Sequence, residues 1–228
     1  MAVHTRLTKR EISDILSVYR IGNLLNFSGI QEGIENTNYK IKTTNNYYIL
    51  TIFEERVNKK NLPFFLNLML NCSKKKICCP KPILDTSGKL TNNFKKKEIA
   101  LFSFLTGKSK KNWSEINCFD VGKTLGEFHT VNKSFKDKIS NEFGLVFWKE
   151  IFKKMDRFKL DSIIPGIHKL LKKELEIINL NWPKNLPKGI IHADLFPDNV
   201  FFKGKRISGI LDFYFSCHDF LIYDLAIT

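Results

Sequence analysis

Three polar residues near the carboxyl-terminal end of the sequence have the types and the spacing that phosphoryl transfer requires. Asp194 and Asn199 lie five residues apart in a polar turn, and Asp212 follows an apolar stretch further along the chain. Residues 200–202 and 207–211 have the pattern of two hairpin arms, so the three side chains are predicted to lie together at one end of the hairpin. One carboxylate could accept the proton of an attacking hydroxyl group, while the amide and the other carboxylate offer hard oxygen atoms to Mg²⁺.

Each of these residues also has an ordinary structural explanation. Aspartate and asparagine often cap turns, and His192 is expected to make a structural hydrogen bond. Asp219 and Asp224 are expected near the start of a helix, where carboxylates satisfy free N–H groups, so we assign them structural roles. The conjunction of His-x-Asp, Asn, a hairpin arm and Asp-Phe is harder to explain in this way, and it favours a phosphotransferase.

The first part of the sequence predicts a lobe with several strands. A helix begins at Thr8, which has capping-box spacing to Glu11. Strands are predicted over residues 39–43 and 47–53, after a polar turn at residues 31–38. A strand, a turn and a returning strand can form a flap whose N–H groups face phosphates. An ordinary hairpin turn is the alternative, because the segment holds a single glycine.

The second part of the sequence predicts mainly helices. An apolar strand over residues 98–105 runs into a lysine-rich segment, residues 107–112, which is the candidate boundary between lobes. A helix capped by Ser114 follows, and further helices are predicted over residues 145–157 and 163–180. The predicted inner face of the helix after Ser114 holds Cys118, Val121, Leu125, Phe128 and His129. We assign no chemistry to the histidine of that face.

This order of elements suits a two-lobed α+β architecture with the site in the cleft. The predicted amino-terminal, nucleotide-binding lobe covers residues 1–107, and the predicted carboxyl-terminal, catalytic lobe covers residues 108–228.

Composition and charge restrict the function further. The chain has 37 basic and 23 acidic residues, a net charge of +14, which raises the hypothesis of nucleic-acid binding. The lysine runs are scattered along the chain, however, so solvated faces are the favoured interpretation and no nucleic-acid partner is expected. No secretory signal or membrane-spanning apolar run is recognised, and the five cysteines form no CxxC pair. We therefore expect a cytoplasmic protein without a membrane partner.

The motifs as a group resemble those of the aminoglycoside-phosphotransferase and choline-kinase-like superfamily, whose fold is protein-kinase-like. The resemblance rests on His192-x-Asp194-x4-Asn199, on Asp212-Phe213 and on the Tyr-Asp-Leu-Ala sequence at residues 223–226. Within this superfamily the homoserine kinases are most similar, through residues 33–38, 62–66 and 192–202. The resemblance implies transfer of the ATP γ-phosphate to the hydroxyl group of L-homoserine, a step of threonine biosynthesis.

The resemblance also implies roles for individual residues. Asp194 is similar to the base that orients the substrate hydroxyl, and Asn199 and Asp212 are similar to the Mg²⁺ ligands. Residues 33–38 resemble the flap over the phosphates, and residues 102–105 resemble the stretch that meets the adenine ring. The residues expected to bind ATP are Gly33, Asn36, Asn38, Phe104, Asn199 and Asp212.

Two departures from the superfamily pattern bear on activity. Thr51 stands where a strand lysine would hold the α- and β-phosphates, and residues 62–70 of the following helix contain no acidic partner. Arg56 and Lys42 are the alternative cations for the phosphates. The sequence also stops where members of this family continue into further helices, so we expect a carboxyl-terminally shortened chain. Kinases of another hydroxyl acceptor (aminoglycoside, choline or sugar) and an inactive nucleotide-binding protein remain alternatives.

Overall fold

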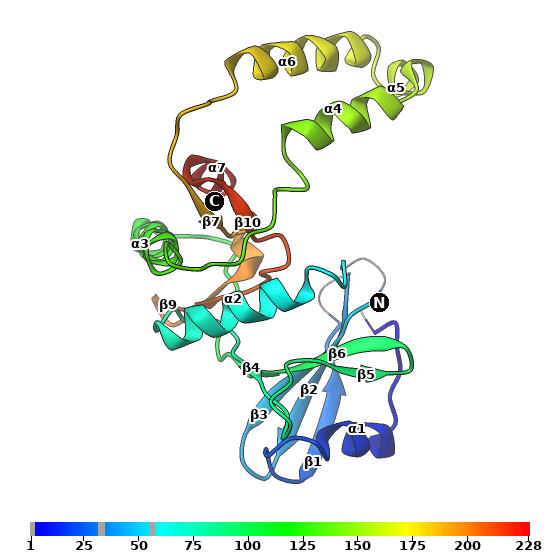
Figure 1. The fold of residues 1–228 in the computed structure, drawn as a ribbon, viewed down its shortest axis with the longest axis vertical. Coiled ribbons are helices and arrows are strands. Elements are labelled where there is room, and N and C mark those ends of the chain that lie inside the picture. Colours follow the sequence, from blue (N-terminus) through cyan, green and yellow to red (C-terminus); the bar gives the residue numbers. More distant parts are fainter. Residues whose placement is uncertain (1–2, 32–34, 55–57) are drawn as a thin grey trace.

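The computed structural model describes residues 3–31, 35–54 and 58–228, and it has the predicted two-lobed α+β architecture (Figure 1). The elements of the first lobe are α1 (Lys9–Leu16), β1 (Leu24–Gly29), β2 (Thr37–Thr43), β3 (Tyr47–Ile52), α2 (Leu62–Lys74), β4 (Pro82–Ile83), β5 (Asn92–Phe94) and β6 (Lys97–Ser103). The elements of the second lobe are α3 (Glu115–Val131), α4 (Leu145–Lys154), α5 (Arg157–Ile163), α6 (Ile167–Asn181), β7 (Lys188–Ile191), β8 (Val200–Lys203), β9 (Arg206–Ile210), β10 (Cys217–Phe220) and α7 (Leu221–Ile227).

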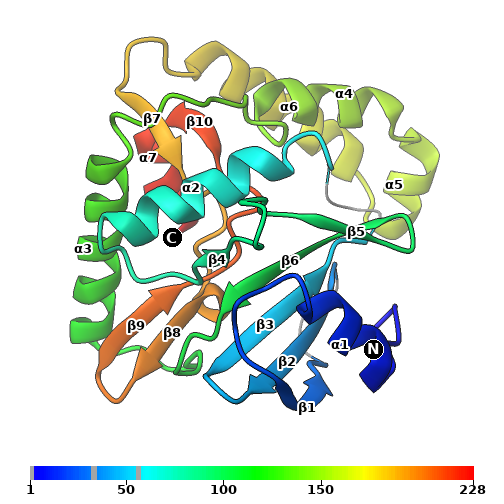
Figure 2. The same cartoon turned by 60° about the horizontal axis from the view of Figure 1, so that its bottom comes forward.

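The first lobe is an antiparallel sheet with strand order β1-β2-β3-β6-β4, in which β5 also pairs with β6. Side chains alternate between its two faces. Leu50, Ile52 and Leu101 are buried in the core that α1 completes, whereas Ala100 and Phe102 are buried in the core that α2 completes. Helix α2 therefore lies on the side of the sheet that faces the second lobe, as Figure 2 also shows.

Strand β1 was not predicted as a strand. It is an edge strand that pairs with β2, and its register shifts between Leu24 and Asn26. Its side chains are half-buried or exposed throughout, so the sequence lacks the clean alternation of apolar and polar residues that predicts a strand.

The segment predicted to connect the lobes contains a glycine that its surroundings require. Gly107 has a φ of +133°, and a Cβ atom there would lie 2.3 Å from Oγ of Ser208 and 2.9 Å from the carbonyl oxygen of Phe202. The next residue, Lys108, exchanges two backbone hydrogen bonds with Phe202, of 3.2 and 2.9 Å. The connecting segment thus packs directly on the β8–β9 hairpin, which carries the candidate site at its other end.

The structure corrects the helices predicted after residue 144. The two predicted helices are three, because the side chain of Asp156 caps a new helix and Pro165 and Gly166 interrupt the chain before α6. Gly166 has a φ of +81°. Helices α4, α5 and α6 contain no fully buried residue and extend away from the rest of the lobe (Figure 1).

The predicted inner face of α3 is wrong at Cys118, which is exposed. Asn117 and Asp120 are buried in its place. Asn117 donates to the carbonyl oxygen of Lys205 at 3.0 Å, and Arg206 donates to the carboxylate of Asp120 at 3.1 Å. Polar residues can occupy this face because the tip of the β8–β9 hairpin supplies their partners.

Within residues 3–31, 35–54 and 58–228, no helix is long and apolar enough to span a membrane.

Candidate active site

The site begins where β7 delivers the chain into the predicted catalytic loop. His192 is fully buried directly after β7, and Ala193 adopts a left-handed conformation with a φ of +63°. Few residues other than glycine adopt this conformation. The carboxylate of Asp224 on α7 accepts the N–H groups of His192 at 2.8 Å and of Ala193 at 2.9 Å. These bonds hold the backbone on the amino-terminal side of Asp194.

Asp194 and Asn199 are in contact. The amide nitrogen Nδ2 of Asn199 donates to the carboxylate of Asp194 and to its carbonyl oxygen, each at 2.8 Å. The 3₁₀ turn Pro197–Asn199 folds the asparagine back over the loop. The carbonyl oxygen of Asn199 then accepts the N–H group of Leu211 at 2.8 Å, which places Asp212 beside the pair. The structure thus brings together the three residues that the hairpin pattern predicted to be neighbours.

His192 links the two loops of the site as a neutral imidazole. Its Nε2 atom lies 2.8 Å from the carbonyl oxygen of Leu211, which can only accept, so Nε2 carries the hydrogen. Its Nδ1 atom then accepts the N–H group of Asp194 at 3.3 Å. Burial lowers the pKa of His192, which agrees with this neutral form. The residue has the structural role expected from the sequence.

Both carboxylates of the site have raised pKa values, because each is at least partly removed from water. Burial raises the pKa of Asp194 to about 6, although the Asn199 hydrogen bond opposes the shift. Repulsion from Asp198 and Glu35 adds a smaller increase. Burial, and then repulsion from Asp194, raises the pKa of Asp212 to about 6 as well. A cation between the two side chains would remove this penalty.

The chemistry of the donor set fits Mg²⁺. The Oδ1 atom of Asp212 is buried and has no hydrogen-bond partner among the residues that the structure describes. Because Asn199 uses Nδ2 on Asp194, its side-chain oxygen is the atom left for a cation. No cluster of three or more His, Cys, Asp or Glu residues suited to a metal occurs in the described part of the chain. Mg²⁺ is commonly bound by one or two protein ligands together with substrate phosphates, so a sparse set is the expected one.

The predicted phosphate flap is described only in part, because Gly33 lies outside the described residues. Asn36 is buried, and its side-chain oxygen accepts the N–H group of Glu54 at 3.3 Å. Asn38 pairs across the sheet with Thr51, whose hydroxyl group donates to the Asn38 side chain at 2.7 Å. The carboxylate of Glu35 acts on both Asp194 and Asp212, so this segment approaches the site.

Of the two cations considered for the phosphates, Lys42 lies at the wrong end of its strand. It pairs with Tyr47 at the far end of β2 from the flap, and its Nζ atom is 5.8 Å from the centre of the Tyr47 ring. It lines a hollow of about 280 Å³, with Asn26, Phe27, Ser28, Lys40 and Tyr47. Arg56, the other candidate, lies outside the described residues.

Phe104, expected near the adenine ring, contacts two of the residues that line this hollow. Its ring centre is 5.9 Å from that of Tyr47, and the Nζ atom of Lys40 lies 4.4 Å from it. Its N–H group donates to the carbonyl oxygen of Tyr47 at 3.3 Å. A nucleotide base meeting this stretch could therefore use the carbonyl oxygen of Phe104 but not its N–H group.

Aromatic packing occupies the place where the superfamily pattern has a lysine–glutamate pair. Helix α2 presents Phe65, whose ring centre lies 5.8 Å from that of Tyr214, and Phe53 contacts the same tyrosine at 5.5 Å. Thr51 itself is uncharged, and its hydroxyl group is satisfied by the Asn38 side chain. An uncompensated buried charge would be costly, which explains why the lysine and the glutamate of the superfamily pattern are both replaced here and not only one of them.

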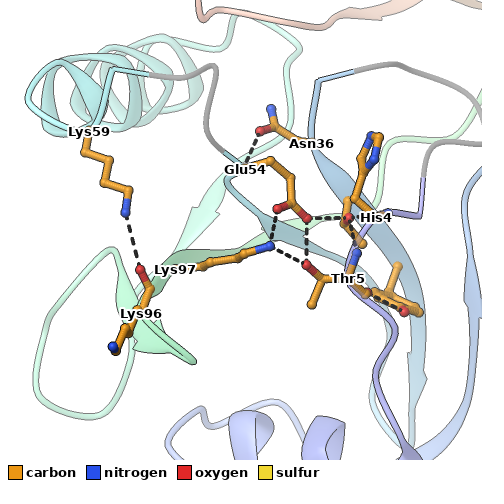
Figure 3. A network of polar contacts seen from close by, with 9 residues as sticks. His4, Thr5, Asn36, Glu54, Lys59, Lys96 and Lys97 are labelled. Atoms are coloured by element: carbon orange, nitrogen blue, oxygen red, sulfur yellow. Dashed lines mark hydrogen bonds and ion pairs between the residues drawn. The ribbon is translucent and has the colours of Figure 1, made fainter.

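The sheet does contain a lysine–glutamate ion pair, between Lys97 and Glu54, but at a different place (Figure 3). Lys97, at the start of β6, donates to Glu54 and to the hydroxyl group of Thr5. Glu54 also accepts the hydroxyl groups of Thr5 at 2.8 Å and of Thr37 at 2.7 Å. Thr37 and Tyr39 are two residues apart in β2, so their side chains lie on the same face of the sheet. Tyr39 is buried in the core formed with α1, so this cluster lies on the sheet face opposite Thr51. It ties the amino-terminal segment to the sheet.

Asp224 was expected to satisfy N–H groups at a helix start, and the structure gives it other partners. It lies in α7 but accepts from the catalytic loop, and the imidazole of His129 lies 2.7 Å from it. No local sequence signal predicts this, because the partners lie 31, 32 and 95 residues away along the chain.

Comparison with known proteins gives a consistent result. A model of the "Phosphotransferase enzyme family" matches residues 26–228. The homoserine kinase of Rhizobium meliloti (strain 1021) is 41% identical over 227 residues, which is 100% of this chain and 69% of that protein. The homoserine kinase of Xanthobacter autotrophicus (strain ATCC BAA-1158 / Py2) is 40% identical over the same length, covering 70% of that protein.

Solved structures share the fold. Spectinomycin phosphotransferase APH(9)-Ia, in complex with ADP and spectinomycin, superimposes with a TM-score of 0.73 at 16% identity, over 98% of this chain and 74% of that one. Amicoumacin kinase hAmiN, in complex with AMP-PNP, Ca²⁺ and Ami, gives a TM-score of 0.75 at 15% identity, over 97% of this chain and 68% of that one. The bilobal protein-kinase-like fold expected from the motifs is confirmed.

Proposed function

The chain belongs to the phosphotransferase enzyme family, and we propose that it transfers the γ-phosphate of ATP to the side-chain hydroxyl group of L-homoserine, giving O-phospho-L-homoserine. The observation that carries the proposal is the Asp194–Asn199–Asp212 cluster, set in a chain that aligns along its whole length with homoserine kinases at about 40% identity. Similarity of this extent supports L-homoserine as the acceptor, and the cluster supports phosphoryl transfer as the reaction.

In this proposal Asp194 orients the acceptor hydroxyl and takes its proton. The Asn199 amide fixes the carboxylate of Asp194 from one side, so one carboxylate oxygen is held and the other faces the substrate. The raised pKa of about 6 makes Asp194 a stronger base than an ordinary aspartate while leaving it largely ionised near neutral pH.

Asn199 and Asp212 would hold Mg²⁺, which supplies charge neutralisation on the phosphates when it is bound. The buried, unpartnered oxygen of Asp212 supports this role. Asn36 and Asn38 would position the flap, and the stretch that contains Phe104 would meet the adenine ring. The remaining contribution of the protein is orientation of two bound reactants.

We place this reaction in threonine biosynthesis and in the cytoplasm. All five cysteines are free thiols, three of them buried, which fits a reducing compartment.

The test measures ADP release with ATP and Mg²⁺ in the presence of L-homoserine, choline, an aminoglycoside or a sugar. We expect stimulation by L-homoserine alone and a loss of about 10²–10⁴-fold in turnover for Asp194→Ala. Asp198→Ala is the matched control, since Asp198 is an exposed carboxylate of the same loop. Stimulation by another acceptor would assign a different kinase, and ATP binding without any phosphorylated product would support the inactive nucleotide-binding alternative.

A further inference from the structure

The carboxylate of Asp224 is a fully buried charge with three hydrogen-bond donors around it. Two are the main-chain N–H groups of His192 and Ala193, and the third is Nε2 of His129, at 2.7 Å. A carboxylate only accepts, so Nε2 carries a hydrogen whether the imidazole is neutral or charged. The catalytic loop and α3 are therefore held by the same side chain.

The two loop bonds stabilise an unfavourable conformation. Ala193 has a φ of +63°, a region in which a residue with a Cβ atom is strained. Asp194 follows immediately, so the direction of its side chain depends on this backbone being held. If Asp224 rotated, the N–H groups of His192 and Ala193 would lose their acceptor together.

Helix α3 contacts this region through two consecutive residues. The ring centre of Phe128 lies 6.1 Å from that of His192 and 6.0 Å from that of Phe213. His129 reaches Asp224 from the same turn of the helix. The helix is well anchored, because Ser114 forms a capping box at its start and Asn132 bonds back to Phe128 at its end.

We propose that His129 is a positioning residue: by fixing the orientation of the Asp224 carboxylate, it holds the catalytic loop in the strained conformation that directs Asp194 toward the acceptor hydroxyl. The catalytic part of this inference rests on the proposed function. This role differs from simple core packing because it depends on one hydrogen-bond donor of the imidazole, and not on the volume that the ring fills. A side chain that restores this donor should restore the loop.

The first test compares His129→Ala with His129→Gln, whose amide nitrogen can take the place of Nε2. Because a hydrogen bond to a charged group contributes about 1.5–3 kcal/mol, His129→Ala should lower kcat about 10- to 100-fold, with KM for ATP and acceptor changing less than about twofold. His129→Gln should recover most of kcat. Glu127→Ala, an exposed position on the same helix, is the control and should leave kcat unchanged.

The second test needs no turnover, so it separates this inference from the proposed function. Amide hydrogen exchange should show His192 and Ala193 exchanging at least about tenfold faster in His129→Ala, while the amides of β8 and β9 keep their protection. His129→Gln should restore slow exchange at both positions. A wild-type chain without kinase activity would remove the proposed function but leave this difference intact. Unchanged exchange at His192 and Ala193, or an equal loss of protection throughout the lobe, would overturn the proposal.

Discussion

Replacing Asp212 with asparagine should stabilise the nucleotide-free protein and abolish its phosphotransferase activity. The carboxylate of Asp212 is buried, its Oδ1 atom has no hydrogen-bond partner among the described residues, and Asp194 repels it. Asparagine removes the charge at nearly constant shape. It also tolerates the left-handed backbone at this position, where φ is +55°, so the substitution isolates the electrostatic effect.

The magnitude follows from the pKa of the carboxyl group. Burial and then the charge of Asp194 raise the pKa of Asp212 from 3.8 to about 6. Each pKa unit corresponds to about 1.4 kcal/mol, so ionised Asp212 costs the folded state about 3 kcal/mol at most. Because Asp212 as a whole is only partly shielded from solvent, the single substitution should recover about 1–3 kcal/mol, or roughly 2–10 °C in Tm for a chain of this size.

The sign of the pH dependence is fixed by the direction of the shift. Below a pH of about 4 the carboxyl group is protonated in both the folded and the unfolded chain, so the wild type and the variant should be equally stable. Between about pH 4 and pH 6 the unfolded chain ionises Asp212 while the folded chain still holds the proton, so the wild type loses stability, and above about pH 6 the loss is complete. The advantage of Asp212→Asn should therefore develop between pH 4 and pH 7.

Thermal unfolding followed by circular dichroism, with a chelator and without nucleotide, measures this advantage at both pH values. Asp137→Asn is the control, because this carboxylate is exposed and does not act on Asp212, and its effect should stay within about 0.5 kcal/mol. Equal Tm values for Asp212→Asn and wild type at pH 7, or an advantage that persists at pH 4, would refute the reasoning.

Two further predictions concern the sheet, and urea unfolding measures both. Thr51→Lys restores the lysine of the superfamily pattern. It should lower the free energy of unfolding by about 3 kcal/mol or more, because Thr51 is buried against Asn38 and α2 offers no acidic partner. The control Thr51→Val should cost only about 1 kcal/mol, and a gain in stability for the lysine variant would contradict this prediction. Lys97→Met should cost about 1–2 kcal/mol at pH 7, a value reduced for the partial exposure of the lysine, since Glu54 loses its cation. Burial raises the pKa of Glu54, but hydrogen bonds from Lys97, Thr37 and Thr5 outweigh it and lower the pKa overall. The stability lost in Lys97→Met should therefore shrink as the pH falls below about 4, where Glu54 becomes protonated. A loss of stability that does not depend on pH would exclude the ion pair as its cause.

The sequence alone determined the parts of this protein that depend on nearby residues. The capping box at Thr8 and the cap at Ser114 predicted where two helices begin, and both caps are present. The turn that holds Asp194 and Asn199 and the hairpin that returns to Asp212 were also predictable, because about twenty residues contain all the polar groups and apolar positions involved. Their roles in catalysis remain predictions, since they depend on ligands as well as on the chain.

Only the tertiary structure decided which distant groups complete the site. Asp224 bonds to the catalytic loop and to His129, and Lys97 pairs with Glu54 on the sheet face away from Thr51. These pairings join residues from 31 to 95 positions apart, and no local periodicity encodes them. A buried polar group must be satisfied by whatever partner folding brings within about 3 Å, so its identity follows from the packing of elements and not from the spacing of residues.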